Sequence, residues 1–359
     1  RRKILWLFAV TLLAGVGTLK AEWTEPYYHE ELLSWWGGNI SGTDPFLSDD
    51  GLTIYLSRHR WLEDTYDLAE AYRDTPDGLF TSKRVISELY TGNKQMSPWV
   101  SSDQLRLYYC EWVGSEGYIK MAERFSVGDT WTYVKTFDEI HTDGFNDAHP
   151  TLTPDELMMF WTKTAGAGNK HVYVATRTSI DDPFTGMTEL TELYDATDGN
   201  VASPCILNDG LTIYFSSNHE TPEACIYRAT RPSTDEPFGD IQMLEFCEPD
   251  KRESSPYVTP DEETVYYRGN LGLWGIYVTH WIDPYDNAVQ SIEEAIGEKT
   301  KAIEVIEAAI DKEMTALEAL QELTAGGEYG DWGLRRIDIF RARIRIILSM
   351  LRQRRARAE

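Results

Sequence analysis

The chain has 359 residues, of which 42% are hydrophobic and 12% aromatic, a composition that excludes an intrinsically disordered protein. Its formal net charge of −25 at pH 7 excludes a general affinity for phosphate backbones, so we expect no nucleic-acid partner. The length allows one large hydrophobic core or two modest ones.

The first 21 residues have the pattern of a secretory signal peptide. Three basic residues precede an apolar run over residues 4–13, and small residues follow up to Ala21. Because this run is short for a membrane span, we expect cleavage after Ala21 and no stable membrane span afterwards. The signal peptide predicts a periplasmic or extracellular location, and a retained membrane anchor is the alternative.

Five copies of a β-hairpin follow one another between residues 22 and 284. In the best copy, 203–216, two short strands flank Asn208-Asp209-Gly210, and Asp-Gly between apolar runs is typical of a tight turn. The turn Asp recurs in all five copies, so we interpret it as a turn former. Each copy opens with a proline, and these prolines are 52–54 residues apart: Pro45, Pro98, Pro150, Pro204 and Pro256. Such a period is typical of radial or solenoid arrays of short strands.

Each period contains two further strands. The third strand carries an apolar residue, Ala and Arg in a common pattern, as in Ile226…Ala229…Arg231, and we expect these arginines to pair with carboxylates between blades. The fourth strand follows an aromatic residue, which the fifth copy lacks and which Trp23 supplies instead. We therefore predict an all-β five-bladed β-propeller over residues 22–284, closed by the amino-terminal strand within Trp23–Leu33.

After residue 284 the apolar period changes to that of helices. Ile303, Ile306 and Ile310 belong to a stripe typical of a coiled coil, and a second stripe around Phe340 follows a glycine-rich break. The first segment is rich in Glu and the second in Arg. This charge pattern predicts an antiparallel helical hairpin over residues 285–359, which offers a route to a homo-oligomer.

The repeat resembles the WD-like repeat of TolB-type β-propellers. The resemblance rests on Ser-Pro followed by Asp-Gly and Tyr-Phe, as in 203–216, and on Ile-Tyr-x-Ala at 226–229, and it extends over residues 44–281. It implies a periplasmic or extracellular binding scaffold. TolB has more blades and a separate amino-terminal domain, neither of which is recognisable here, so its partners in the Tol machinery do not carry over.

A second resemblance concerns Asp44-Pro45 at the start of the first blade. Five-bladed glycosidases of the arabinanase and fructosidase type open their first blade with Asp-Pro, and the resemblance implies a general base or nucleophile at Asp44. These enzymes also need an acid Glu, which is missing at the other repeat starts: Ser97-Pro98, His149-Pro150, Ser203-Pro204 and Ser255-Pro256. Glycoside hydrolysis is therefore the alternative function.

The loops that enter the first strands are expected at one mouth of the propeller channel, where ligands usually bind. Asp44 and His149 replace the Ser that the repeat prefers before its Pro, so they are candidate ligand-binding residues together with Asp147, Arg252 and Glu253. In an enzyme, Asp44, Asp147 and Glu253 would be the catalytic carboxylates and His149 a proton carrier. Otherwise Asp44 accepts a hydrogen bond within its own loop.

Two of the four cysteines are expected side by side. Cys225 begins one strand of the fourth repeat and Cys247 ends the next, so an exported chain would join them by a disulfide, whereas Cys110 and Cys205 are expected to be buried thiols. We predict no metal site, because the chain has no CxxC motif and its seven histidines lack ligand spacing. No cofactor is predicted, although an acidic mouth is compatible with Ca²⁺.

Three functional hypotheses follow from these patterns. The favoured one is a non-catalytic scaffold of the cell envelope that binds a protein or a glycan. The first alternative is a glycoside hydrolase that uses carboxylates at the channel mouth, and the second is an assembly protein that oligomerises through its helices. Whether the protein is an enzyme stays open at this point, because propellers host many chemistries.

Overall fold

The computed structural model describes residues 22–30, 32, 40–60, 62–165, 168–193, 199–218, 221–248 and 250–282, and a few positions between 301 and 315. Residues 22–282 form one structural unit. The predicted signal peptide lies outside the described residues, as does most of the predicted helical hairpin, of which the described positions between 301 and 315 are helical. No helix within the described ranges is long and apolar enough to cross a membrane.

Apart from Leu32 and the helical positions between 301 and 315, the regular elements of the described residues are short strands and three 3₁₀ helices. In chain order the strands are β1 (Glu22–Trp23), β2 (Tyr27–Tyr28), β3 (Ile40–Leu47), β4 (Thr53–Arg60), β5 (Thr65–Tyr72), β6 (Ser82–Val85), β7 (Lys94–Val100), β8 (Arg106–Val113), β9 (Glu116–Glu123), β10 (Thr132–Thr136), β11 (Phe145–Leu152), β12 (Met158–Ala165), β13 (Lys170–Thr176), β14 (Thr185–Glu189), β15 (Val201–Ile206), β16 (Thr212–Ser217), β17 (Cys225–Thr230), β18 (Gly239–Met243), β19 (Glu253–Val258), β20 (Thr264–Asn270) and β21 (Trp274–Ile282). The 3₁₀ helices are η2 (Ser87–Leu89), η3 (Asp138–Ile140) and η4 (Thr191–Leu193).

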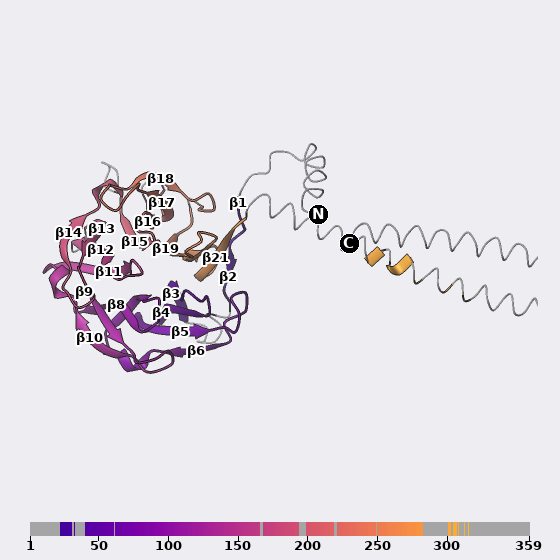
Figure 1. Cartoon of the computed structure of the whole chain (residues 1–359), viewed down its shortest axis with the longest axis horizontal. Helices are drawn as coiled ribbons and strands as arrows, with labels where there is room; N and C mark the ends of the chain where they lie inside the picture. The colour runs from indigo at the N-terminus through magenta and orange to yellow at the C-terminus, as the bar shows by residue number, and fades with distance from the viewer. Residues whose placement is uncertain are drawn as a thin grey trace, which may run out of the picture. The chain divides into compact units, whose positions relative to one another are not determined.

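These strands form five antiparallel sheets, which we call blades 1–5 (Figure 1). Blades 1–4 contain β3–β6, β7–β10, β11–β14 and β15–β18 in sequence order, and blade 5 contains β19, β20, β21 and the amino-terminal strands. In Figure 1 the first strands β3, β11, β15 and β19 lie toward the centre, whereas β6, β10, β14 and β18 lie at the periphery. This is the five-bladed β-propeller that the repeat predicts.

Blade 5 obtains its outer strand from the amino terminus. Both β1 and β2 pair with β21 in antiparallel fashion, with Trp23 opposite Trp281 and Tyr28 opposite Tyr277. The paired rings also pack together, since the centroids of Trp23 and Trp281 are 5.4 Å apart and those of Tyr28 and Tyr277 are 5.1 Å apart. The predicted pairing of the amino-terminal segment with the last sheet is therefore confirmed.

The hairpin turns follow the chemistry expected of their Asp residues. In blade 1, Asp50 accepts hydrogen bonds from Ser48 Oγ at 2.6 Å and from Leu52 N at 2.9 Å. The next turn position has positive φ and is Gly in blades 1 and 4 but Gln104, Glu156 or Glu262 in the others. In those three turns the side chain accepts a hydrogen bond from a tyrosine of the preceding blade, at 2.5–3.1 Å: Tyr55 to Gln104, Tyr108 to Glu156 and Tyr214 to Glu262.

The recurring arginine that follows the third strand fastens each of blades 1–4 to the blade before it. In blade 2, Arg124 Nε donates to the carbonyl of Gln104 at 2.7 Å, and its Nη2 donates to the hydroxyl of Tyr55 in blade 1 at 2.9 Å. The guanidinium also stacks on Trp131, 4.2 Å from the ring centroid. The expected carboxylate partner is present as well, because Glu70 of blade 1 lies 3.6 Å from Arg124 Nη1. Three further arginines make equivalent contacts. Each donates to a hairpin-turn carbonyl of its own blade, stacks on the aromatic residue before the fourth strand and contacts a side chain of the preceding blade: Arg73, Arg177 and Arg231.

Replacing Arg124 by Ala is expected to lower the free energy of unfolding by about 2–4 kcal/mol. The change removes a stacked cation and leaves the buried groups of Tyr55 and Glu70 with one partner fewer. Urea unfolding measures the loss, and Arg124→Lys should recover less than half of it because Lys lacks the forked geometry. The control is Arg252→Ala, which removes an exposed pair with Glu223 and should cost less than about 0.5 kcal/mol. If Arg124→Ala lowers the free energy of unfolding no more than this control does, Arg124 does not fasten blade 2 to blade 1.

Candidate functional site

The residues directly before the five repeat prolines form what we call the inner ring: Asp44, Ser97, His149, Ser203 and Ser255. Each has a positive φ between 49° and 58° and lies at a bulge, where the register with the second strand shifts. This backbone costs about 1–2 kcal/mol at a non-glycine residue. Hydrogen bonds between blades offset the cost, because the inner-ring N–H groups of blades 2, 4 and 5 donate to hydroxyls of the preceding blade at 2.8–3.0 Å.

The inner ring and the hairpin turns line a small cavity on the propeller axis. Its volume is about 70 Å³. Aromatic rings narrow it, since the centroid of Phe46 lies 5.8 Å from that of Trp99 and 5.0 Å from that of Tyr257. Small-molecule sites usually measure about 300–1,000 Å³, so this cavity holds at most a few water molecules. A larger ligand would therefore contact the rim of the channel rather than enter it.

Asp44 and His149 meet within the inner ring although they come from blades 1 and 3. His149 Nε2 lies 3.7 Å from Asp44 Oδ1. The other oxygen, Oδ2, accepts hydrogen bonds from Ser57 Oγ at 2.8 Å and from Thr43 Oγ1 at 3.3 Å. The structure thus brings together the two residues that depart from the repeat, and it also supplies the local hydrogen bond expected for Asp44.

Asp44 is the ionised carboxylate of the inner ring. Burial by itself would raise its pKa, but His149, Arg268 and Ser57 outweigh burial and hold the pKa of Asp44 below its usual range. The guanidinium of Arg268 lies 5.0 Å from the ring centroid of Trp274. Its buried Nε has no hydrogen-bond partner among the described residues. Asp44 and His149 thus bring a carboxylate and an imidazole to the axial cavity. Arg268 does not line that cavity, but its charge acts on Asp44 and its Nε is an unsatisfied donor.

Sequence reasoning misses Arg268. In the ladder of blade 5, Arg268 lies opposite Ser254, the residue before the inner-ring residue Ser255. The equivalent positions of the other four second strands hold small residues: Ser57, Cys110, Thr162 and Ser216. The sequence does contain a signal for this residue, because Arg268 departs from the repeat on the second strand as Asp44 and His149 depart from it on the first.

Asp147 lies in blade 3 with both of its carboxylate oxygens engaged. Oδ1 accepts hydrogen bonds from Trp161 Nε1 at 2.8 Å and from Lys163 Nζ at 3.0 Å, and Oδ2 lies 2.7 Å from His141 Nδ1. The side chains of Asp147 and Lys163 are 1% and 3% exposed. Asp147 is thus the counter-charge of a buried lysine rather than a group open to a ligand.

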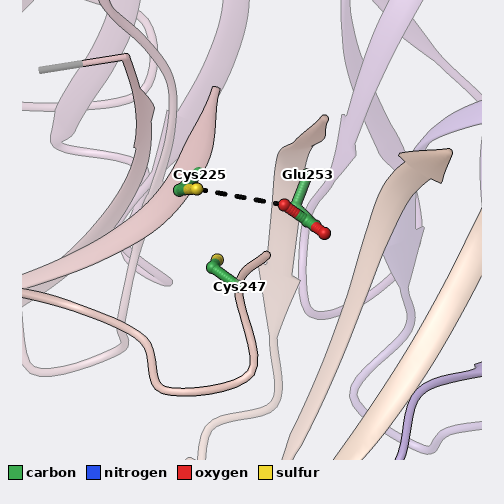
Figure 2. Close-up of side chains that lie close together, drawn as sticks. All are labelled: Cys225, Cys247 and Glu253. Atoms are coloured by element: carbon green, nitrogen blue, oxygen red, sulfur yellow. Dashed lines mark hydrogen bonds between the residues drawn. The ribbon is translucent and has the colours of Figure 1, made fainter. Parts of the chain in front are cut away.

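Arg252 and Glu253 are neighbours in the sequence but lie in different surroundings. Arg252 is exposed, and its Nε donates to Glu223 at 3.1 Å. Glu253 is fully buried, and its Oε2 lies 4.0 Å from the Sγ of Cys225 (Figure 2). Burial, reinforced by the nearby Cys225 and acidic side chains, raises the pKa of Glu253 to about 8. Of the predicted residues, only Asp44 and His149 line the axial cavity.

The predicted disulfide between Cys225 and Cys247 is not formed, although the two residues do lie close together. All four cysteines are free and buried, as expected for Cys110 and Cys205. Cys247 lies beyond the end of β18, so it does not face Cys225 across the strand ladder. Its sulfur instead accepts a hydrogen bond from Ile226 N at 3.1 Å.

Replacing Asp147 by Ala should lower the free energy of unfolding by about 3–5 kcal/mol, because it leaves the charge of Lys163 buried without its counter-charge. The double variant Asp147→Ala with Lys163→Met should be more stable than the single variant, since it removes that charge as well. Urea unfolding of both variants measures this. If the double variant is no more stable than Asp147→Ala, the ion pair does not account for the role of Asp147.

Asp44→Asn should change how stability depends on pH. The pKa of Asp44 is lower in the folded chain than the value of about 3.9 expected for the unfolded one. Its ionised form therefore stabilises the fold above that pH, and the contribution is lost as the pH falls below about 4. We expect Asp44→Asn to be about 1–2 kcal/mol less stable than the wild type at neutral pH, with a difference that shrinks in acid. Urea unfolding over this range is the measurement, and a pH-independent difference would be the contrary result.

No family model matches the chain, and no curated protein is similar to it. Among solved structures, it resembles TolB from Acinetobacter baumannii at 13% identity over 68% of each chain, with a TM-score of 0.41. It also resembles the endo-arabinase from Bacteroides thetaiotaomicron VPI-5482 at 12% identity over 68% of this chain and 94% of that one, with a TM-score of 0.47. The α-L-arabinofuranosidase from Lactobacillus brevis gives 14% identity over 68% and 91% of the two chains, with a TM-score of 0.48. These likenesses are distant.

Proposed function

We propose that this chain is a non-catalytic binding protein whose propeller recognises a protein or a glycan at the mouth around Asp44, His149 and Arg268. Asp44 supplies an ionised acceptor, and Arg268 supplies a buried donor without a partner among the described residues. An unsatisfied buried donor costs about 1–3 kcal/mol, which a ligand carrying hydrogen-bond acceptors would recover.

The observation that carries the proposal is that, of the three candidate carboxylates, only Asp44 lines the axial cavity. Glycoside hydrolysis needs two carboxyl groups about 5–10 Å apart on either side of a sugar. Asp44 lines the axial cavity, whereas Asp147 is held by Trp161, Lys163 and His141, and Glu253 is buried beside Cys225. A cavity of about 70 Å³ also leaves no room for a sugar ring. Recognition at the rim requires neither a second carboxylate nor a deep pocket.

The proposal includes export to the periplasm or the cell exterior, which rests on the signal-peptide pattern of residues 1–21. It also keeps the predicted helical hairpin over residues 285–359, whose support is the apolar stripes and the helical conformation of the described positions between 301 and 315. Oligomer formation through this hairpin would present several propeller mouths to one ligand and raise the avidity.

The test is binding of the full chain to a glycan array and a peptide array, together with reducing-sugar release from arabinan and xylan oligosaccharides. We expect a bound glycan or peptide and no sugar release. Asp44→Asn and His149→Ser should each weaken that binding about tenfold or more, which corresponds to about 1.4 kcal/mol. Asp181→Asn, a change to an exposed carboxylate on a peripheral loop, is the matched control and should bind like the wild type.

Three results would overturn the proposal. Sugar release that is lost in Asp44→Asn would make the protein a hydrolase. Absence of any wild-type signal on both arrays would remove the binding function, and equal weakening by Asp181→Asn would show that the inner ring is not the site.

A further inference from the structure

We propose that Cys225, Cys247 and Glu253 bind one zinc ion between blades 4 and 5. Figure 2 shows the three side chains converging from three separate elements. Cys225 begins β17, Cys247 follows β18, and Glu253 begins β19. This site is separate from the inner ring, so it does not depend on the binding function proposed there.

The distances between the three groups suit a shared ion. One ligand atom from each residue lies within 4.8 Å of the other two, and the Sγ of Cys225 lies 4.0 Å from the Oε2 of Glu253. Around a tetrahedral zinc ion, with bonds of about 2.3 Å to sulfur and about 2.1 Å to oxygen, ligand atoms lie about 3.6–3.8 Å apart. Movements of the side chains alone would close the remaining gap.

The Glu253 carboxylate is only partly satisfied, because among the residues described just its Oε2 accepts a hydrogen bond, from the Cys225 thiol. Its exposure is 0%, and its Oε1 has no hydrogen-bond partner within the described part of the chain. The equivalent residue of blade 3, Asp147, faces Lys163 across the ladder and is neutralised by it. Glu253 faces Gly269 instead, so the opposite strand offers no cation. A bound cation would do for Glu253 what Lys163 does for Asp147.

The two thiols are also departures from the repeat. The backbone N–H of Cys247 closes a turn by donating to the carbonyl of Leu244. The residues that close the equivalent turns of blades 1–3 are aliphatic: Leu89, Ile140 and Leu193. Cys225 pairs with Ser217, and the equivalent third-strand residues are Asp67, Tyr118 and His171. Two sulfurs therefore occur together beside a buried carboxylate, Glu253, that has no cation opposite it on the neighbouring strand.

This ligand set favours zinc over harder cations. Two thiolates and a carboxylate suit Zn²⁺, whereas Ca²⁺ and Mg²⁺ prefer oxygen ligands throughout. Binding would release the two thiol protons and the proton of the Glu253 carboxyl group to solvent, and would leave a net charge of about −1 on the cluster, with a fourth position for water. Because the ligands come from blades 4 and 5, the ion would join these blades and stabilise the fold.

The experiment uses the untagged full chain, reduced, freed of metal with a chelator, and then equilibrated with Zn²⁺ alone. We expect about one zinc ion per chain by elemental mass spectrometry and an increase in Tm of about 5 °C or more. Co²⁺ in place of Zn²⁺ should give thiolate-to-cobalt charge-transfer absorption. This spectrum is read on the wild type, so it stays informative even if a variant fails to fold.

The matched variants separate this cluster from the other thiols. Cys225→Ser, Cys247→Ser and Glu253→Gln should each weaken zinc binding about tenfold or more, whereas Cys110→Ser and Cys205→Ser, which change buried thiols elsewhere, should retain it. The proposal is overturned if the reduced protein takes up less than about 0.2 zinc ions per chain. It is equally overturned if the cobalt spectrum lacks thiolate bands, or if Cys110→Ser or Cys205→Ser abolishes uptake while the cluster variants do not.

Discussion

The pairing of β1 and β2 with β21 is the constraint on which the whole propeller depends. Without it, β21 would expose a free edge, and blade 5 would be held to blade 1 by side chains alone. The same seam contains the contact of Arg73 with the Tyr266 hydroxyl at 3.4 Å and a core cluster that joins Leu56 of blade 1 to Ile276 of blade 5. Closure also sets the inner ring, because Asp44 reaches His149 only when all five first strands surround one axis.

The number of blades could be predicted because the same signal occurs five times. Each repeat carries a proline and an Asp turn, four of the five carry the arginine, and one repeat cannot bury its sheet faces without neighbours. A repeated background also makes exceptions visible, which is why Asp44 and His149 could be identified from their replacement of Ser. Arg268 is an exception of the same kind on the second strand, where the other four repeats hold Ser, Cys or Thr.

The surroundings of Asp147 and Glu253 could not be predicted from strand periodicity. Residues two positions apart share a face only while the strand is regular, and a bulge interrupts each first strand at the inner ring. Asp147 and Glu253 each lie two positions before an inner-ring residue, yet they point into the seam between blades. The proximity of Cys225 and Cys247 was predictable from neighbouring strands, but the end of β18, which decides against a directly opposed pair, was not.

The amino-terminal closure also has a mechanical consequence. Glu22 begins β1 and lies opposite Ile282, which ends β21, so the chain enters and leaves the propeller at the same end of one antiparallel pair. A force that pulls these two points apart would load the ladder bonds of β1 one after another, as in opening a zipper, rather than all at once in shear. A ring that resists unfolding in solution would therefore yield to tension at a single place, and it would open at blade 5 first.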